Sequence, residues 1–143
     1  MSTEIQKLLV WSQATIAGLH LDEFAKVHGG VLDEPERRQI DENVRRAAYQ
    51  IIAGKGATYY GIGSAVAHIV DVLLHDQRAI LTVCSRISGA PDYEGLTLAL
   101  PHLVSGDGVL ATIPLPLTPT ERDGLRRSAD ILREAVAELT LIQ

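Results

Sequence analysis

The sequence predicts an α+β fold, and three observations carry that prediction. Apolar residues recur at helical spacing on both sides of a glycine-rich stretch at residues 54–63. Short β-branched or alternating runs follow at residues 79–84, 96–100 and 109–113, with a turn signal at 106–108 before the last run. A final helical pattern then continues to Leu139. Helices, three strands and one more helix indicate a small antiparallel sheet with segregated helices.

Length and composition fit one globular domain of 143 residues, of which 46% are hydrophobic and 22% charged. The net charge of −5, with no contiguous basic run, excludes nucleic acid as the expected partner. Cys84 is the only cysteine, which rules out an internal disulfide and favours a cytoplasmic protein. No signal peptide is visible, and no membrane partner is expected, since a spanning helix needs about 20 apolar residues.

Capping residues predict where two of the helices begin. Asp33 can cap the first, Pro35 suits its first turn, and Glu36 stands where a capping-box acid belongs. The sequence Thr118-Pro119-Thr120-Glu121 is the strongest such signal and opens the last helix. The apolar faces of the two helices beside the glycines comprise Ile40, Val44, Ala48, Ile51 and Ile52, then Ile62, Val66, Ile69 and Leu73.

Four glycines lie within the ten residues 54–63. Glycine costs about 1 kcal/mol inside a helix, so they predict a kink or a close approach of the backbone to another group. Gly61-x-Gly63-x-x-Val66 is close to a dinucleotide fingerprint, but that motif needs a preceding strand and an acid about 20 residues on. A helical pattern precedes it here, and residues 83–85 contain no acid. The Gly54-Lys55-Gly56 sequence also lacks the Walker spacing, so both phosphate interpretations are rejected.

The run IDENVRRAAYQIIAGKGATYYGIG at residues 40–63 resembles the long kinked helix of bacterial L-lactate dehydrogenases. Further similarities lie in VWS at 10–12, AILTV at 79–83, LALP at 98–101, the glycines of 106–108, and SA-x-x-L at 128–132. GATYYGIG is specific for the lactate branch, because related malate dehydrogenases typically lack threonine at the position of Thr58. The resemblance divides the chain into a divergent segment, 1–8, and an incomplete C-terminal substrate domain, 9–143.

The resemblance implies a lactate/malate dehydrogenase C-terminal domain-like fold without the Rossmann domain. It also implies roles for two residues. Thr58 would contact the carboxylate and methyl side of pyruvate or lactate, and Ile62 would pack near the nicotinamide ring of NAD. A small hydroxyl between glycines and an apolar neighbour suit these roles. Without the resemblance, Thr58 would be interpreted as a helix cap and Ile62 as core.

The family reaction is the NAD-dependent interconversion of (S)-lactate and pyruvate, and its catalytic groups do not align with this chain. The family's histidine motif should fall just before Val10-Trp11-Ser12, where Thr3 occupies the place of the histidine. The family's nucleotide-binding half and its arginines lie further upstream. We therefore assign no catalytic residue, and expect the chain alone to be inactive and to bind no NAD.

The remaining candidate residues have ordinary explanations. His68 and His75 are seven residues apart, too far for a two-ligand metal site on one helix turn, so no metal is expected. His20 and His28 are assigned to a loop-rich segment, and His102 is placed after a strand. Cys84 is interpreted as a buried strand residue. The adjacent tyrosines, Tyr59 and Tyr60, are interpreted as helix packing.

Three functions remain open. In the first, the chain supplies part of the substrate site of a lactate dehydrogenase, and another polypeptide segment supplies the N-terminal half of that enzyme. Alternatively, it is a non-catalytic oligomerisation or interaction module, or a truncated fragment, whose exposed apolar helix face drives self-association. The third possibility, an independent domain that binds small acids, rests on Thr58 alone.

Overall fold

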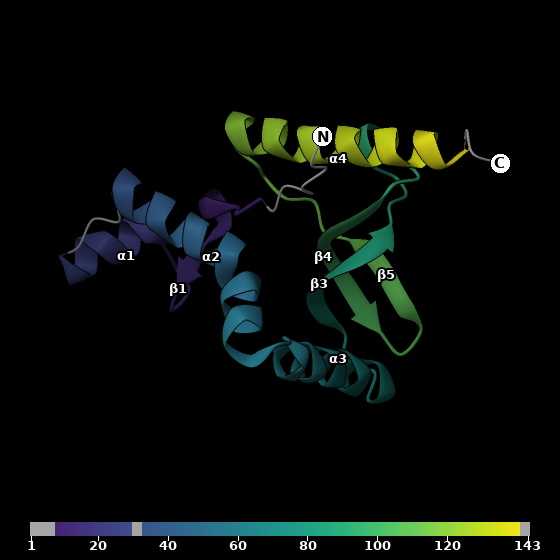
Figure 1. Cartoon of the computed structure of the whole chain (residues 1–143), viewed down its shortest axis with the longest axis horizontal. Helices are drawn as coiled ribbons and strands as arrows, with labels where there is room; N and C mark the ends of the chain where they lie inside the picture. Colours follow the sequence, from purple (N-terminus) through teal and green to yellow (C-terminus); the bar gives the residue numbers. More distant parts are fainter. Residues whose placement is uncertain (1–7, 30–32, 141–143) are drawn as a thin grey trace.

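The computed structural model describes residues 8–29 and 33–140. A small three-stranded sheet lies between two helices: α4 (Pro119–Thr140) runs along one end of it and α3 (Tyr59–Leu74) along the other (Figure 1). Helix α2 (Glu34–Lys55) meets α3 at an angle, and α1 (Leu21–His28) lies beside the start of α2. The α+β prediction is therefore confirmed, with the long kinked helix, the three strands and the C-terminal helix all present.

The three-stranded sheet is antiparallel with the order β3-β4-β5. Its strands are β3 (Ala79–Arg86), β4 (Thr97–Ser105) and β5 (Gly108–Thr112). Strands β3 and β4 pair from Ala79 opposite Val104 to Arg86 opposite Thr97. The ladder between β4 and β5 has an irregularity at Leu103/Val104. Two short 3-10 helices, Trp11–Gln13 and Pro91–Tyr93, and the two-residue strands Thr15–Ile16 and Leu19–His20 complete the described elements.

The core lies where α4 packs on the sheet. Ala129 of α4 is fully buried and joins Ile87, Leu98 and Leu100 in one cluster. At the other end of the sheet, Val72 of α3 is also fully buried. The remainder of α3 is much more exposed, which leaves a very apolar helix with little cover.

Both predicted capping signals are confirmed. Asp33 accepts a hydrogen bond from the Glu36 N–H at 2.9 Å, and the Glu36 carboxylate accepts one from the Asp33 N–H at 3.2 Å. At α4, the Glu121 N–H donates to the Thr118 hydroxyl at 3.3 Å, while the Thr118 N–H donates to the Glu121 carboxylate at 2.9 Å. Each pair satisfies backbone N–H groups that a helix start leaves without an intrahelical partner.

Two sequence-based assignments on the strands are wrong. Cys84 is exposed, because β3 turns Ile80, Thr82, Cys84 and Arg86 to one open face of the sheet. His102 does not follow a strand but lies inside β4, and it is fully buried. Its Nδ1 lies 3.2 Å from the Thr112 hydroxyl oxygen, while Nε2 has no partner within the described residues.

Two further assignments also fail. His20 and His28 do not lie in a loop-rich segment: His20 ends a short strand and caps α1, and His28 is the last residue of that helix. Tyr59 and Tyr60 contact each other, with ring centroids 4.6 Å apart, but are 58% and 76% exposed. Within the described part of the chain they do not pack the helix against a neighbour. The residues 1–7, which include Thr3, lie outside the described residues.

Candidate functional site

The glycine stretch forms an elbow between α2 and α3. Helix α2 ends at Lys55, and Gly56 follows in the left-handed conformation, φ 78°, with its N–H donating to the Ile52 carbonyl at 2.8 Å. Glycine adopts this conformation at no steric cost, so it stops the helix cleanly. Helix α3 begins at Tyr59, so three residues separate it from the end of α2. The predicted kink is confirmed, and the element directly before the glycine stretch is a helix rather than a strand.

Thr58 stands at the N-cap position of α3 but does not act as a side-chain cap. Its backbone has φ −109° and ψ 26°, and its side chain makes no capping hydrogen bond. This differs from Asp33, whose carboxylate does cap α2. Thr58 is half-buried, and its hydroxyl makes no capping hydrogen bond to the helix. The alternative interpretation of Thr58 as a cap is confirmed for its N-cap position, but its side chain makes no capping hydrogen bond.

An open hollow of about 600 Å³ lies at the elbow between α2 and α3. Thr58 and Ile62 both line it, so the two residues that the resemblance singled out share one cavity. Ile62 is 65% exposed and is not a core residue. Most of the remaining lining is apolar or small; it comprises Val44, Ala47, Ala48, Gln50, Ile51, Gly54, Lys55, Ala57, Tyr60 and Gly61.

The glycines in the two helices have open space around them. A Cβ atom built at Gly54, Gly61 or Gly63 would meet no atom within 4 Å. The close approach that these glycines predicted as an alternative to the kink is thus not made by any described residue of the chain. A group that approaches the elbow from outside would reach the bare backbone there.

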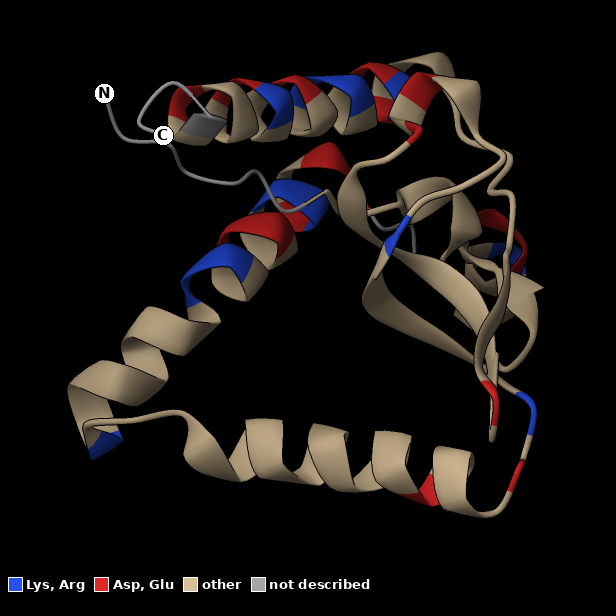
Figure 2. Ribbon diagram, turned by 90° about the vertical axis from the view of Figure 1, so that its right-hand side faces the viewer, with Lys and Arg blue, Asp and Glu red and all other residues tan. Residues whose placement is uncertain are grey.

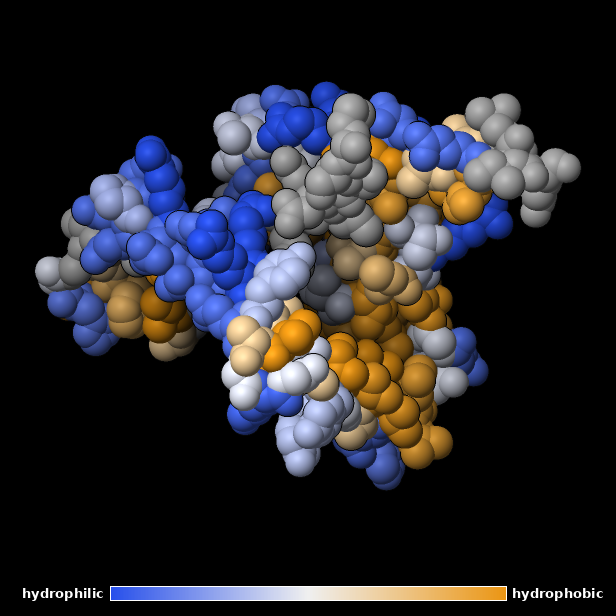
Figure 3. All heavy atoms as spheres, in the orientation of Figure 1, coloured by the Kyte–Doolittle hydropathy of each residue, from blue (hydrophilic) through white to orange (hydrophobic). Residues whose placement is uncertain are grey.

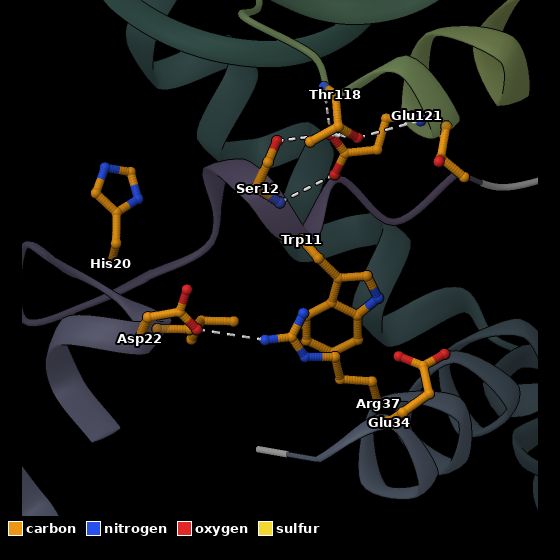
Figure 4. A pocket seen from close by; sticks show the side chains of 10 residues that line it. Trp11, Ser12, His20, Asp22, Glu34, Arg37, Thr118 and Glu121 are labelled. Carbon is orange, nitrogen blue, oxygen red and sulfur yellow. Dashed lines mark hydrogen bonds and ion pairs between the residues drawn. The ribbon is translucent and has the colours of Figure 1, made fainter. Parts of the chain in front are cut away.

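A second hollow, of about 610 Å³, lies beside the first residues of the described chain (Figure 4). The Arg37 guanidinium stands 5.9 Å from the centroid of the Trp11 ring and pairs with Asp22 at 3.6 Å. Glu121 reaches in from α4 and accepts hydrogen bonds from Ser12. The charged groups of this hollow that carry these contacts already have partners, so we interpret the cluster as a structural junction.

A third hollow, of about 490 Å³, is lined mainly by leucines between the sheet and α4. No group of three or more potential metal ligands occurs among the residues that the structure describes. No helix within residues 8–29 or 33–140 is long and apolar enough to cross a membrane. The elbow remains the hollow in which both predicted site residues meet.

The two helices that form the elbow, α2 and α3, differ in charge and hydropathy. Lysine, arginine and acidic residues concentrate on α4 and on the first half of α2, while α3 carries almost none (Figure 2). Hydrophobic residues gather over the lower part of the sheet and adjoining α3 (Figure 3). The exposed apolar residues of α3 include Ile62, Val66, Val70 and Leu74, spaced four apart, at 65%, 51%, 42% and 77% exposure. Such a stripe on a helix is typical of a face that packs against another element.

The kinked helix pair, the antiparallel sheet and the C-terminal helix form an alpha/beta C-terminal domain of the dehydrogenase class, as the comparisons with known proteins show. The chain belongs to the lactate/malate dehydrogenase family, whose alpha/beta C-terminal domain it matches over residues 6–141.

Its relatives include the L-lactate dehydrogenases of Geotalea daltonii, 48% identical over 135 residues, and Thermus aquaticus, 44% identical over 133 residues. These alignments cover 94% and 93% of this chain but 43% of each relative. Among solved structures, the minor L-lactate dehydrogenase of Enterococcus mundtii superimposes with a TM-score of 0.82 at 30% identity, covering 95% of this chain and 42% of that one. The chain therefore corresponds to the C-terminal domain of L-lactate dehydrogenases and spans less than half their length.

Proposed function

We propose that this chain is the substrate domain of an NAD-dependent L-lactate dehydrogenase, which interconverts (S)-lactate and pyruvate. The observation that carries the proposal is the meeting of Thr58 and Ile62 in one hollow at the elbow. A volume of about 600 Å³ with a mainly apolar lining and few polar groups suits a small organic acid beside a cofactor ring.

In this proposal the two side chains have separate tasks. The Thr58 hydroxyl, which the helix does not use, donates a hydrogen bond to the substrate carboxylate and packs beside the methyl group. Ile62 presents an apolar surface that keeps water away from the nicotinamide. NAD, when bound, supplies or accepts the hydride. Acid–base chemistry and the positive charges that bind the carboxylate come from residues that the family carries upstream of the matched domain.

The proposal predicts that the 143-residue polypeptide alone will not oxidise NADH with pyruvate. Loss of absorbance from NADH, followed in a spectrophotometer, measures this directly. Robust turnover by the isolated chain would contradict the assignment of its chemistry to another segment. Such an enzyme is expected to be located in the cytoplasm, in agreement with the single cysteine, which is exposed and free.

A chimera tests the positive half of the proposal. Residues from Leu9 onward replace the matching C-terminal part of the Geotalea daltonii relative, whose own N-terminal part is retained. We expect this protein to reduce pyruvate with NADH. Thr58→Ala and Ile62→Asn should each lower its activity, while Glu138→Gln on the exposed side of α4 serves as the matched control. A folded chimera without pyruvate reduction would rule the proposed function out.

A second candidate, self-association, is favoured by the exposed stripe on α3. Monomers rarely leave large contiguous apolar patches in water. Light scattering of the isolated chain should then show dimers or larger species, and an apolar dye should bind. A monomer that binds no dye would eliminate this candidate. An effect of oxamate on the melting temperature of the isolated chain would instead favour independent binding of small acids.

A further inference from the structure

We propose that Lys55 is a positioning residue that attracts the carboxylate of a small 2-oxo acid into the elbow hollow, beside Thr58. The inference rests on the proposed function, because it concerns the same hollow and the same anionic substrate. It assigns a role to a residue that neither the sequence motifs nor the resemblance singled out.

Lys55 is the charged residue at the elbow. It is the last residue of α2, directly before Gly56, and it lines the hollow together with Thr58 and Ile62. No other residue with a formal charge contributes to that lining. Lys55 and Thr58 therefore border the same otherwise apolar space.

The other basic residues of α2 already have acidic neighbours. Within the described residues, the ion pairs of this helix are Arg37–Asp22, Arg38–Glu34, Arg45–Asp41 and Arg46–Glu42. None of the ion pairs found there includes Lys55. An ammonium group with no acidic partner retains its attraction for an incoming anion, whereas a paired guanidinium is largely neutralised.

The net charge of the chain makes a local cation useful at this place. The 143 residues carry a net charge of −5, which disfavours the approach of a carboxylate to this domain. A single positive group at an otherwise apolar hollow counteracts that repulsion locally. The attraction is electrostatic and solvent-exposed, so added salt should screen it.

Helix electrostatics offer another reason for a lysine at this position, and the chain contains a matched control for it. Lysine in the last turn of a helix interacts favourably with the helix dipole. Lys26 occupies the last turn of α1 and is exposed like Lys55, yet it lines none of the hollows described above. Lys26→Gln therefore removes a last-turn lysine from α1 without changing the elbow hollow, while Lys55→Gln removes both the interaction with the α2 dipole and the attraction at the hollow.

The test compares Lys55→Gln, Lys55→Arg and Lys26→Gln in the chimera described above. At low ionic strength, Lys55→Gln should raise the KM for pyruvate by about 5–10-fold and leave kcat nearly unchanged, as expected for lost electrostatic attraction. Lys55→Arg should restore KM, and Lys26→Gln should match the parent. In about 0.5 M salt the difference in KM should largely disappear, because the Debye length falls well below 10 Å.

Equal KM values for Lys55→Gln and Lys26→Gln would overturn the role of Lys55. A loss confined to kcat, or one that salt leaves unchanged, would also overturn it. The proposed function fails separately, through a parent chimera that does not reduce pyruvate. The rise in melting temperature caused by oxamate, measured on the same variants, does not depend on turnover: a smaller rise for Lys55→Gln alone supports the inference, and equal rises contradict it.

Discussion

The carboxylate of Glu121, at the start of α4, holds Ser12 across 109 residues of sequence. It accepts hydrogen bonds from the Ser12 backbone N–H at 2.9 Å and from the Ser12 hydroxyl at 2.6 Å. The N–H and hydroxyl of Thr118 donate two more, at 2.9 and 2.8 Å. Burial raises the pKa of Glu121, but these hydrogen bonds outweigh it and lower the pKa to about 2. One side chain thus caps α4 and joins it to the first described segment of the chain (Figure 4).

Glu121→Gln should destabilise the chain by up to about 3 kcal/mol at pH 7, since a pKa lowered from 4.5 to about 2 corresponds to a contribution of about that size. Because the folded pKa is the lower one, the contribution is fully present above about pH 4.5 and is lost as the pH falls toward 2. Urea unfolding at pH 7 and at pH 3 measures the free energy of unfolding of the parent and of the variant at each pH. The variant should lose part of the pH dependence that the parent shows across this interval.

Glu138→Gln supplies the control for that experiment, since Glu138 is an exposed carboxylate on the same helix. It should change the free energy of unfolding by less than about 0.5 kcal/mol. Equal stabilities of the two variants would show that the hydrogen bonds to Ser12 contribute nothing net.

Asp33 and Thr58 stand at the starts of successive helices, but replacing each with alanine should change the stability of the chain by different amounts. Asp33→Ala removes a capping-box acceptor and should cost about 1 kcal/mol of stability. Thr58→Ala removes no capping bond and should change the stability by less than about 0.5 kcal/mol. In the chimera, however, Thr58→Ala should lower kcat/KM by about tenfold or more, as expected for a lost hydrogen bond to a charged group. A Thr58→Ala variant that is unstable yet fully active would invert the assignment.

Much of the fold could be predicted because its signals are local. The capping residues of α2 and α4, the helical periodicity on both sides of the glycines, and the turn at Gly106-Asp107-Gly108 each depend on neighbours a few residues away. Helix α1 escaped prediction, because its eight residues leave few repeats of any apolar pattern. In addition, its N-terminus is capped by His20 and Glu23, and histidine is not among the residues that are usually found at an N-cap.

The candidate site was likewise predicted only where its signals are local. The periodicity and glycines predicted the elbow, but only the resemblance named Thr58 and Ile62. Residues alone could not tell that the Thr58 side chain leaves the helix uncapped. The Ser12–Glu121 contact escaped prediction for another reason: it joins distant segments, and each residue has a sufficient local explanation. The prediction for Cys84 is wrong because strand alternation cannot reveal which face of a sheet is covered. The prediction for His102 is wrong because the predicted strand ends at residue 100, whereas β4 continues to Ser105.

Two glycines in helices should respond differently to alanine. Gly63 lies in α3 with nothing within 4 Å of its missing Cβ, so Gly63→Ala should stabilise the isolated chain by about 0.5–1 kcal/mol. Gly124 lies in α4, where a Cβ would come within 2.9 Å of the Leu8 Cδ1 atom. The same gain in helix propensity should there be offset by displacement of Leu8. Thermal unfolding of both variants checks the contrast, which fails if Gly124→Ala raises the melting temperature as much as Gly63→Ala.

The apolar stripe of α3 should govern the association of the isolated chain. Val66 is 51% exposed and lies mid-stripe, so Val66→Glu should leave the stability within about 1 kcal/mol of the parent. It should nevertheless weaken self-association and reduce the binding of an apolar dye, because a charge at the centre of the face would be buried in the complex. Val136→Glu on α4, at 58% exposure, adds the same charge away from the stripe and so controls for general repulsion. Sedimentation velocity on the three proteins decides the matter: only Val66→Glu should shift the distribution toward monomer, and an equal shift with Val136→Glu would assign the association to some other surface.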